Sequence, residues 1–180
     1  MIRFCDVFFS LLGLIVLSPI FVIIALCIVL DSRGGVFYRQ VRVGRDGKDF
    51  RLFKFRSMAS GADKKGLITV GAKDSRVTRV GYFLRKYKLD ELPQLLNVVR
   101  GEMSLVGPRP EVRKYVDMYT VEQRKVVAVV PGITDYASIE YADENTILGQ
   151  ASDPDRAYVE QIMPDKIRYN MKYINNRCLK

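Results

Sequence analysis

The sequence contains no histidine, and this absence excludes several common kinds of active site. It rules out Ser-His and Cys-His nucleophile pairs, an imidazole general base and a histidine-ligated zinc ion. Cysteine is scarce: Cys5, Cys27 and Cys178 lie far apart, so neither a disulfide framework nor a metal cluster is indicated. Any catalysis by this chain must therefore use carboxylates, amines, phenols or thiols.

Charged residues are missing from one long stretch near the N-terminus. Residues 7–30 read VFFSLLGLIVLSPIFVIIALCIVL, which is longer than the roughly 20 apolar residues that a helix needs to cross a bilayer. A secretory signal peptide is the alternative, but its apolar region is shorter and ends in a small-residue cleavage site. Here the stretch is followed by Asp31-Ser32-Arg33. The pattern therefore predicts a membrane segment.

Ser18-Pro19 lies near the middle of this apolar segment. Proline removes one backbone hydrogen bond and clashes with the preceding turn, so we expect the helix to bend there. Arg3 precedes the segment and many basic residues follow it, so the positive-inside rule favours neither crossing direction. Two topologies stay open on these grounds: a bent crossing, and a helix that enters and leaves the same leaflet.

Positive charge is concentrated directly after the apolar segment. The formal net charge is +9, and only Asp46 and Asp49 oppose the basic residues between positions 33 and 56, namely Arg33, Arg39, Arg42, Arg45, Lys48, Arg51, Lys54 and Arg56. Basic residues beside a membrane segment mark its cytoplasmic side and attract anionic lipid headgroups. We therefore expect the globular part of the chain to be cytoplasmic.

The remaining sequence predicts a mainly helical α+β domain. Two runs rich in Val, Phe and Tyr flank the turn sequence GRDG and predict a β-hairpin over residues 36–58, with Lys54 and Arg56 on one face. A loop is expected over residues 59–75, and Gly107-Pro108-Arg109-Pro110 is expected to form a rigid extended turn. Helices are expected over residues 80–88 and 89–99, from Thr120 to a point before Pro131, after Asp153 and from Pro164. The last helix is amphipathic, so it lies either on the membrane surface or against the domain core.

Asp90 and Glu91 are the acidic pair at the predicted start of the helix over residues 89–99. An aspartate is a favoured N-cap and a glutamate in the first turn complements the helix dipole, so the pair has a purely structural explanation. The neighbouring residues favour a functional explanation, because several basic residues flank the pair: Arg85, Lys86, Lys88, Arg100 and Arg109. Carboxylates among arginines suit a site for phosphate and Mg²⁺, since Mg²⁺ takes one or two carboxylates together with phosphate oxygens.

Three runs of this sequence resemble the bacterial sugar transferase family of monotopic phosphoglycosyl transferases: FYRQVRVGRDGKDFRLFKFRSM, KLDELPQLLNVVRGEMSLVGPRPE and VVPGITDYASI. That family includes undecaprenyl-phosphate galactose phosphotransferases and the initiating enzyme of Campylobacter N-glycosylation. The resemblance implies a re-entrant membrane helix over residues 1–32, kinked at Ser18 and Pro19, followed by a cytoplasmic catalytic domain over residues 33–180. Some members have PGITGWAQVNGRN where this chain has PGITDYASI. The sugar that those members use is therefore not assumed for this chain.

The resemblance also implies a mechanism and a site. Asp90 is expected to be the nucleophile and a magnesium ligand, and Glu91 to orient Asp90 or help to bind the acceptor. Arg85 and Arg109, with Pro108 in the GPRP run, are expected to contact phosphates. Lys54 and Arg56 are weaker candidates for phosphate or headgroup contacts, with a solvated basic strand face as the alternative. The expected reaction moves a sugar 1-phosphate from a uridine diphosphate sugar to polyprenyl (undecaprenyl) phosphate and releases uridine monophosphate.

The partners and the cellular location that we predict follow from this expected reaction. The partners are the nucleotide sugar, the polyprenyl phosphate and the lipids of the bacterial cytoplasmic (inner) membrane, with no nucleic acid; a homodimer stays open. The reaction would be the first membrane step of surface glycan synthesis. Two other classes compete with this reading: a membrane-anchored protein that binds anionic lipid or nucleic acid without chemistry, and a structural subunit of an envelope complex.

Overall fold

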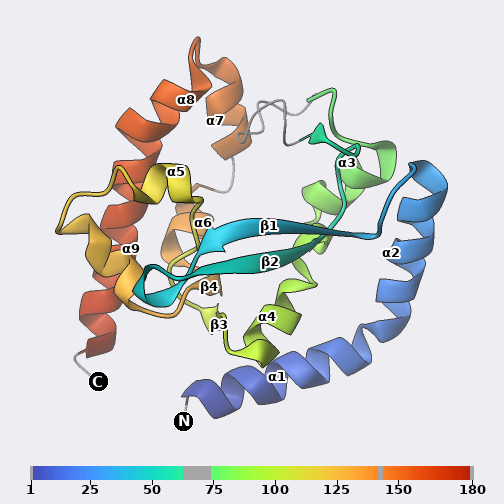
Figure 1. Cartoon of the computed structure of the whole chain (residues 1–180), viewed down its shortest axis with the longest axis horizontal. Helices are drawn as coiled ribbons and strands as arrows, with labels where there is room; N and C mark the ends of the chain where they lie inside the picture. Colours follow the sequence, from blue (N-terminus) through green and yellow to red (C-terminus); the bar gives the residue numbers. More distant parts are fainter. Residues whose placement is uncertain (1, 63–73, 142–143, 179–180) are drawn as a thin grey trace. The chain divides into compact units, whose positions relative to one another are not determined.

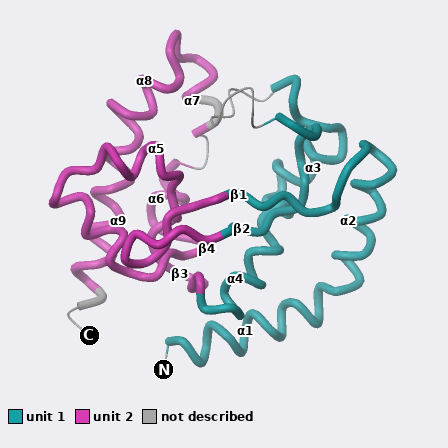
Figure 2. The backbone as a smooth tube through the Cα atoms, viewed as in Figure 1, with its two compact units in different colours: residues 1–40, 51–69, 73–101 teal, residues 41–50, 70–72, 102–180 magenta. Residues whose placement is uncertain are grey.

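The computed structural model describes residues 2–62, 74–141 and 144–178. The chain divides into two compact units, coloured separately in Figure 2. Unit 1 comprises Met1–Gln40, Arg51–Thr69 and Lys73–Gly101, and unit 2 comprises Val41–Phe50, Val70–Ala72 and Glu102–Lys180. The described residues form a mostly helical α+β structure, which confirms the predicted class. The predicted division at residue 32 concerns contact with a bilayer, and it stays a prediction.

Unit 1 begins with two apolar helices, α1 (Ile2–Val16) and α2 (Ser18–Asp31), which meet at a bend of 61° (Figure 1). Ser18 donates its hydroxyl to the carbonyl of Ile15 at 2.8 Å, and Pro19 occupies the first turn of α2, where its missing N–H costs little. No single described helix is long and apolar enough to cross a bilayer, whereas this bent pair is, judged by length and composition alone.

The predicted β-hairpin is present, formed by β1 (Phe37–Val43) and β2 (Asp49–Phe55). Its turn requires two successive positive φ angles, 57° at Asp46 and 73° at Gly47. Aspartate and glycine are residues that adopt this conformation at low cost, so the local sequence determines where the hairpin turns. The base of the hairpin belongs to unit 1 and its tip to unit 2.

Two further helices complete unit 1: α3 (Arg79–Lys86) and α4 (Gln94–Arg100), joined through a 3-10 turn at Leu89–Glu91. A single helix over residues 89–99 was the expectation, and the structure divides it. Pro93 has no N–H to donate to the carbonyl of Leu89, so the α-helix begins only after it. Figure 1 shows α4 lying along α1, in agreement with their residue contacts.

The core of unit 1 joins the apolar helices to the hairpin. Ile24 and Ile28 of α2 pack with Phe55 of β2 and Leu84 of α3, and Leu89 and Leu92 on either side of Asp90 pack against the same cluster. A side chain at Gly81 would place its Cβ only 1.9 Å from the carbonyl oxygen of Ser57, so glycine permits the close approach of α3.

Unit 2 contains a parallel strand pair, β3 (Ser104–Val106) and β4 (Gly132–Thr134), with Ser104 opposite Gly132. Residues 107–110, which follow β3, form neither helix nor strand. The elements that follow are helical: α5 (Arg113–Val116), the 3-10 helix η4 (Gln123–Ala128), α6 (Tyr136–Glu140), α7 (Glu144–Gln150), α8 (Pro154–Ala157), the π-helix η5 (Tyr158–Ile162) and α9 (Met163–Cys178).

The predicted caps of unit 2 are confirmed, with one change of helix type. Thr120 and Gln123 exchange the two hydrogen bonds of a capping box, at 2.9 and 3.3 Å, but the helix that follows is a 3-10 helix. Asp153 accepts the N–H of Arg156 and caps α8. The apolar side of α9 contacts η4 and α6 and buries Ile167, which favours the core alternative for that helix. The predicted loop lies mostly outside the described residues.

Candidate functional site

Asp90 occupies the short turn between α3 and α4. Lys88, which follows α3 and directly precedes the turn, has the left-handed conformation, with φ of 56°, and so redirects the chain. Leu89 and Leu92 then bury their side chains in the core of unit 1 and draw the intervening residues inward. Asp90 is only 5% exposed as a result, although nothing in its own chemistry favours burial.

The carboxylate of Asp90 has no hydrogen-bond or ion-pair partner among residues 2–62, 74–141 and 144–178. Burial raises its pKa above the usual range; Lys54, Arg85 and Lys88 lower that pKa in part, while Glu91 raises it further. An acidic group that is buried, unpaired and close to several cations is more often a functional group than a structural one.

Glu91 is engaged with Lys54 of β2. Their side chains form an ion pair at 3.0 Å, and they are only 15% and 18% exposed. The same lysine is the main cation that lowers the pKa of Asp90. Glu91 therefore holds Lys54 in a position from which its charge acts on Asp90. The role expected for Glu91, orienting Asp90 or helping to bind the acceptor, stays a prediction.

Arg56 is buried, so the alternative of a solvated basic strand face is wrong for this residue. Its side chain is 7% exposed and donates hydrogen bonds to four carbonyls at and just beyond the end of α2, those of Ile28, Ser32, Arg33 and Gly35. The end of α2 leaves backbone carbonyls without intrahelical donors, and a cation placed there complements the helix dipole. Contact between Arg56 and a phosphate stays a prediction.

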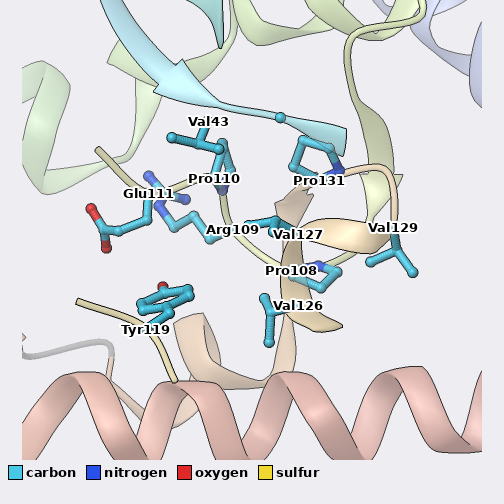
Figure 3. A pocket seen from close by; sticks show the side chains of 11 residues that line it. Val43, Pro108, Arg109, Pro110, Glu111, Tyr119, Val126, Val127, Val129 and Pro131 are labelled. Atoms are coloured by element: carbon cyan, nitrogen blue, oxygen red, sulfur yellow. The ribbon is translucent and has the colours of Figure 1, made fainter. Parts of the chain in front are cut away.

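Arg109 and Pro108 lie in unit 2, directly after β3. The Arg109 N–H donates to Asp135 Oδ2 at 3.1 Å, and its Nη1 donates to the carbonyl of Ile133 at 3.1 Å. The same residues line a small hollow, in which the side chains of Arg109, Glu111 and Tyr119 lie among valines and prolines (Figure 3). The GPRP run is therefore held against β4 and α6 within its own unit.

Unit 1 thus brings together four of the predicted site residues: Asp90, Glu91, Lys54 and Arg85. Three residues that matter to the site were not predicted. Lys88 was noted only as one of several flanking basic residues, although its left-handed conformation shapes the turn. The other two are Asn97, an amide inside the apolar run LLNVV that binds the β2 backbone at Arg51 and Phe53, and Asp135, which anchors Arg109.

Asp90 also fits the magnesium ion that the sequence predicts. The described residues hold no group of three or more His, Cys, Asp or Glu side chains that could form a metal cage. Mg²⁺ is commonly held by one or two carboxylates and completes its shell with water and substrate phosphate oxygens. A single carboxylate whose oxygens accept no hydrogen bond from the described residues is suited to that mode.

Comparison with known proteins finds bacterial relatives over much of the chain. The chain is 37% identical to the UDP-N-acetylgalactosamine-undecaprenyl-phosphate N-acetylgalactosaminephosphotransferase of Aeromonas hydrophila, over 98% of this chain and 40% of that protein. It is 42% identical to the UDP-glucose:undecaprenyl-phosphate glucose-1-phosphate transferase of Escherichia coli (strain K12), over 74% of this chain and 30% of that protein. It is 47% identical to the exopolysaccharide production protein PSS of Rhizobium leguminosarum bv. phaseoli, over 59% of this chain and 54% of that protein.

The chain therefore spans less than two thirds of the length of each of these relatives. The profile of one family, described as bacterial sugar transferase, matches residues 1–180. With the resemblance of its three motif runs and a match over this whole range, the chain belongs to the bacterial sugar transferase family.

Proposed function

We propose that this chain is a membrane-bound phosphoglycosyl transferase that moves a sugar 1-phosphate from a uridine diphosphate sugar to undecaprenyl phosphate. The main support for the proposal is the environment of Asp90: its side chain is buried, has no hydrogen-bond partner among the described residues and lies near three cations. The relatives from Aeromonas hydrophila and Escherichia coli are named for reactions of this class. Donor specificity depends on the shape of a pocket, so the sugar is left open.

In the first proposed step, a carboxylate oxygen of Asp90 attacks the phosphorus atom that carries the sugar. The bond between that phosphorus and the bridging oxygen of the diphosphate breaks, and uridine monophosphate leaves with the electron pair. Asp90 then carries the phosphosugar as an acyl phosphate. A carboxylate nucleophile needs no general base, which agrees with a chain that has no histidine.

In the second proposed step, a phosphate oxygen of undecaprenyl phosphate attacks the same phosphorus atom. The bond to Asp90 breaks, so the product is undecaprenyl diphosphate sugar and the carboxylate is regenerated. Lys54 and Arg85 stabilise the negative charge that develops on the phosphoryl oxygens, and we propose that Arg109 and Pro108 of the GPRP run contribute phosphate contacts. Mg²⁺, held by Asp90, would neutralise phosphate charge and act as a Lewis acid.

The burial pattern of α1 supports a membrane location. Its buried residues are the polar Asp6 and Ser10, while large apolar side chains on the same helix are exposed: Ile2, Phe4, Phe8, Phe9, Leu11, Leu12, Ile15 and Val16. This is the reverse of a soluble protein, which rarely exposes so large an apolar surface. We propose that α1 and α2 enter and leave the cytoplasmic leaflet, as a re-entrant pair bent at Ser18 and Pro19.

The decisive experiment measures uridine monophosphate release by the purified full chain with Mg²⁺, undecaprenyl phosphate and a panel of uridine diphosphate sugars. We expect Asp90→Asn to lower the rate by at least about a thousand-fold, as loss of a covalent nucleophile does. Omitting undecaprenyl phosphate should leave a single burst of release from the wild type and none from Asp90→Asn. Release at equal rates from both proteins, or from neither with any donor, would overturn the proposal.

A further inference from the structure

Two exposed arginines of unit 1 stack on one aromatic ring, outside the candidate site. The guanidinium carbons of Arg39 in β1 and Arg100 at the end of α4 lie 5.0 Å and 4.7 Å from the centre of the Phe53 ring. Neither arginine has a carboxylate partner among the described residues. The ring holds both planar groups in place, whereas their N–H donors have no hydrogen-bond acceptor in the described part of the chain.

Phe53, which carries this arginine pair, and Lys54, which pairs with Glu91, lie on opposite faces of β2. Successive residues of a strand point to opposite faces, so Phe53 and Lys54 face different ways. Lys54 reaches Glu91 of the candidate site, and neither Arg39 nor Arg100 is among the charges that act on Asp90. The Arg39–Phe53–Arg100 cluster therefore does not belong to that site.

The face that carries this cluster is the face that meets the apolar helices. Phe37 shares the β1 face of Arg39, and its ring stacks on Phe55 at 5.4 Å, while Phe21 of α2 contacts Phe55 at 5.0 Å. At the other end, α4 lies along α1, and Arg3 of α1 donates to the carbonyl of Val99, the residue before Arg100. The cluster is therefore bordered by α2 on one side and by the start of α1 on the other.

We propose that Arg39 and Arg100 bind the phosphate group of an anionic phospholipid in the leaflet that holds α1 and α2. Two cations on one ring repel each other, and a shared anion removes that repulsion. A guanidinium group binds phosphate through paired hydrogen bonds and is weakly hydrated, which suits the membrane interface. A lipid is favoured over a soluble anion because the exposed apolar side chains of the neighbouring helix α1 would hold the arginines at headgroup level. The inference rests on the proposal that α1 and α2 insert into the cytoplasmic leaflet.

The test is native mass spectrometry of the full chain in detergent, titrated with phosphatidylglycerol or with phosphatidylcholine. We expect the wild type to bind phosphatidylglycerol more tightly, and the double variant Arg39→Gln/Arg100→Gln to lose roughly 30-fold in that affinity. The matched control is Arg45→Gln/Arg124→Gln, which removes two other exposed arginines, on the hairpin turn and on η4, and changes the net charge equally. It should lose no more than about three-fold.

Equal phosphatidylglycerol affinity of the two double variants would overturn the assignment, as would release of the lipid from the wild type by inorganic phosphate or by a uridine diphosphate sugar. A second variant, Phe53→Leu, keeps an apolar side chain but removes the ring, and it should weaken phosphatidylglycerol binding without changing phosphatidylcholine binding. Uridine monophosphate release, measured on the same samples, separates this site from the proposed reaction. If release persists while lipid preference is absent, only the headgroup site is wrong; if the wild type binds neither lipid, the membrane seating is wrong as well.

Discussion

Two carboxylates, Glu111 in unit 2 and Asp90 in unit 1, differ in how many hydrogen bonds they accept from the described residues. Glu111 in unit 2 accepts hydrogen bonds from Arg42 at 3.0 Å, from the Val112 N–H at 2.8 Å and from the Tyr158 hydroxyl. Asp90 in unit 1 is more deeply buried and accepts none from the described residues. The more deeply buried carboxylate is therefore the one that lacks partners among the described residues.

The difference indicates what each carboxylate is for. The oxygens of Glu111 accept hydrogen bonds from Arg42, the Val112 N–H and Tyr158, all in its own unit, so its interactions stabilise the fold. The oxygens of Asp90 are available to a ligand, at a cost in folding free energy that burial of an unpaired charge always carries. Proteins retain such groups where function requires them. Stability and activity should therefore respond in opposite ways to substitution at the two positions.

The largest effect on stability is expected from Glu111→Gln. The substitution removes the charge that partners Arg42, which is 19% exposed, and weakens the bond from Tyr158. We expect the free energy of unfolding to fall by about 2–3 kcal/mol, because breaking a partly buried pair leaves one charge uncompensated. Circular dichroism in detergent suits the measurement, since the chain has no tryptophan.

The control for this variant is Glu122→Gln, which removes an exposed pair with Lys125 and should change stability by less than about 0.5 kcal/mol. Uridine monophosphate release per folded molecule should be nearly unchanged in both variants. If Glu111→Gln abolished release from a protein that remained folded, Glu111 would belong to the site and the comparison with Asp90 would fail.

A smaller effect of opposite sign is expected from Asp90→Asn. Burial raises the pKa of Asp90, so the folded state holds its proton to a higher pH than the unfolded chain does. The native state is therefore penalised as the pH rises from the unfolded value, about 3.9, to the raised folded value, and the penalty is constant above that. Asparagine removes it, and we expect a gain of about 1–2 kcal/mol at neutral pH.

This gain should shrink as the pH is lowered toward the unfolded value, because the folded state then takes up a proton at Asp90. Thermal unfolding followed at several pH values tests both the sign and the pH dependence. An inactive variant that is more stable than the wild type is the expected result. A loss of stability at neutral pH would mean that Asp90 serves as an ordinary helix cap, the structural explanation that its sequence position also allows.

Features that depend on neighbouring residues could be predicted from the sequence. The hairpin turn follows from Asp46-Gly47, which tolerate positive φ, and the start of α8 follows from the cap at Asp153. The break before α4 has an equally local cause, Pro93, although a single helix was expected over residues 89–99. In each case the deciding interactions span only a few residues.

Features that depend on distant segments could not be predicted in this way. Arg56 reads as an exposed residue of an alternating strand, but the carbonyls that bind it belong to the end of α2 and to the segment after it. Likewise, Glu111 gains Arg42 and Tyr158 only when the chain is folded. The Asp90-Glu91 pair was predicted from its motif, whereas the absence of partners at Asp90 required the structure.

The smallest effect is expected at the ion pair beside Asp90. Lys54 lowers the pKa of Asp90 and Glu91 raises it, so their removal should shift the acid limb of the pH–rate profile in opposite directions. Lys54→Met should move that limb to higher pH and Glu91→Gln to lower pH, while rates at the optimum fall by no more than about ten-fold. A merely structural pair would lower the rate equally at all pH values. In the double variant the two shifts should largely cancel, and a shift in the same direction for both single variants would show that neither charge acts on Asp90.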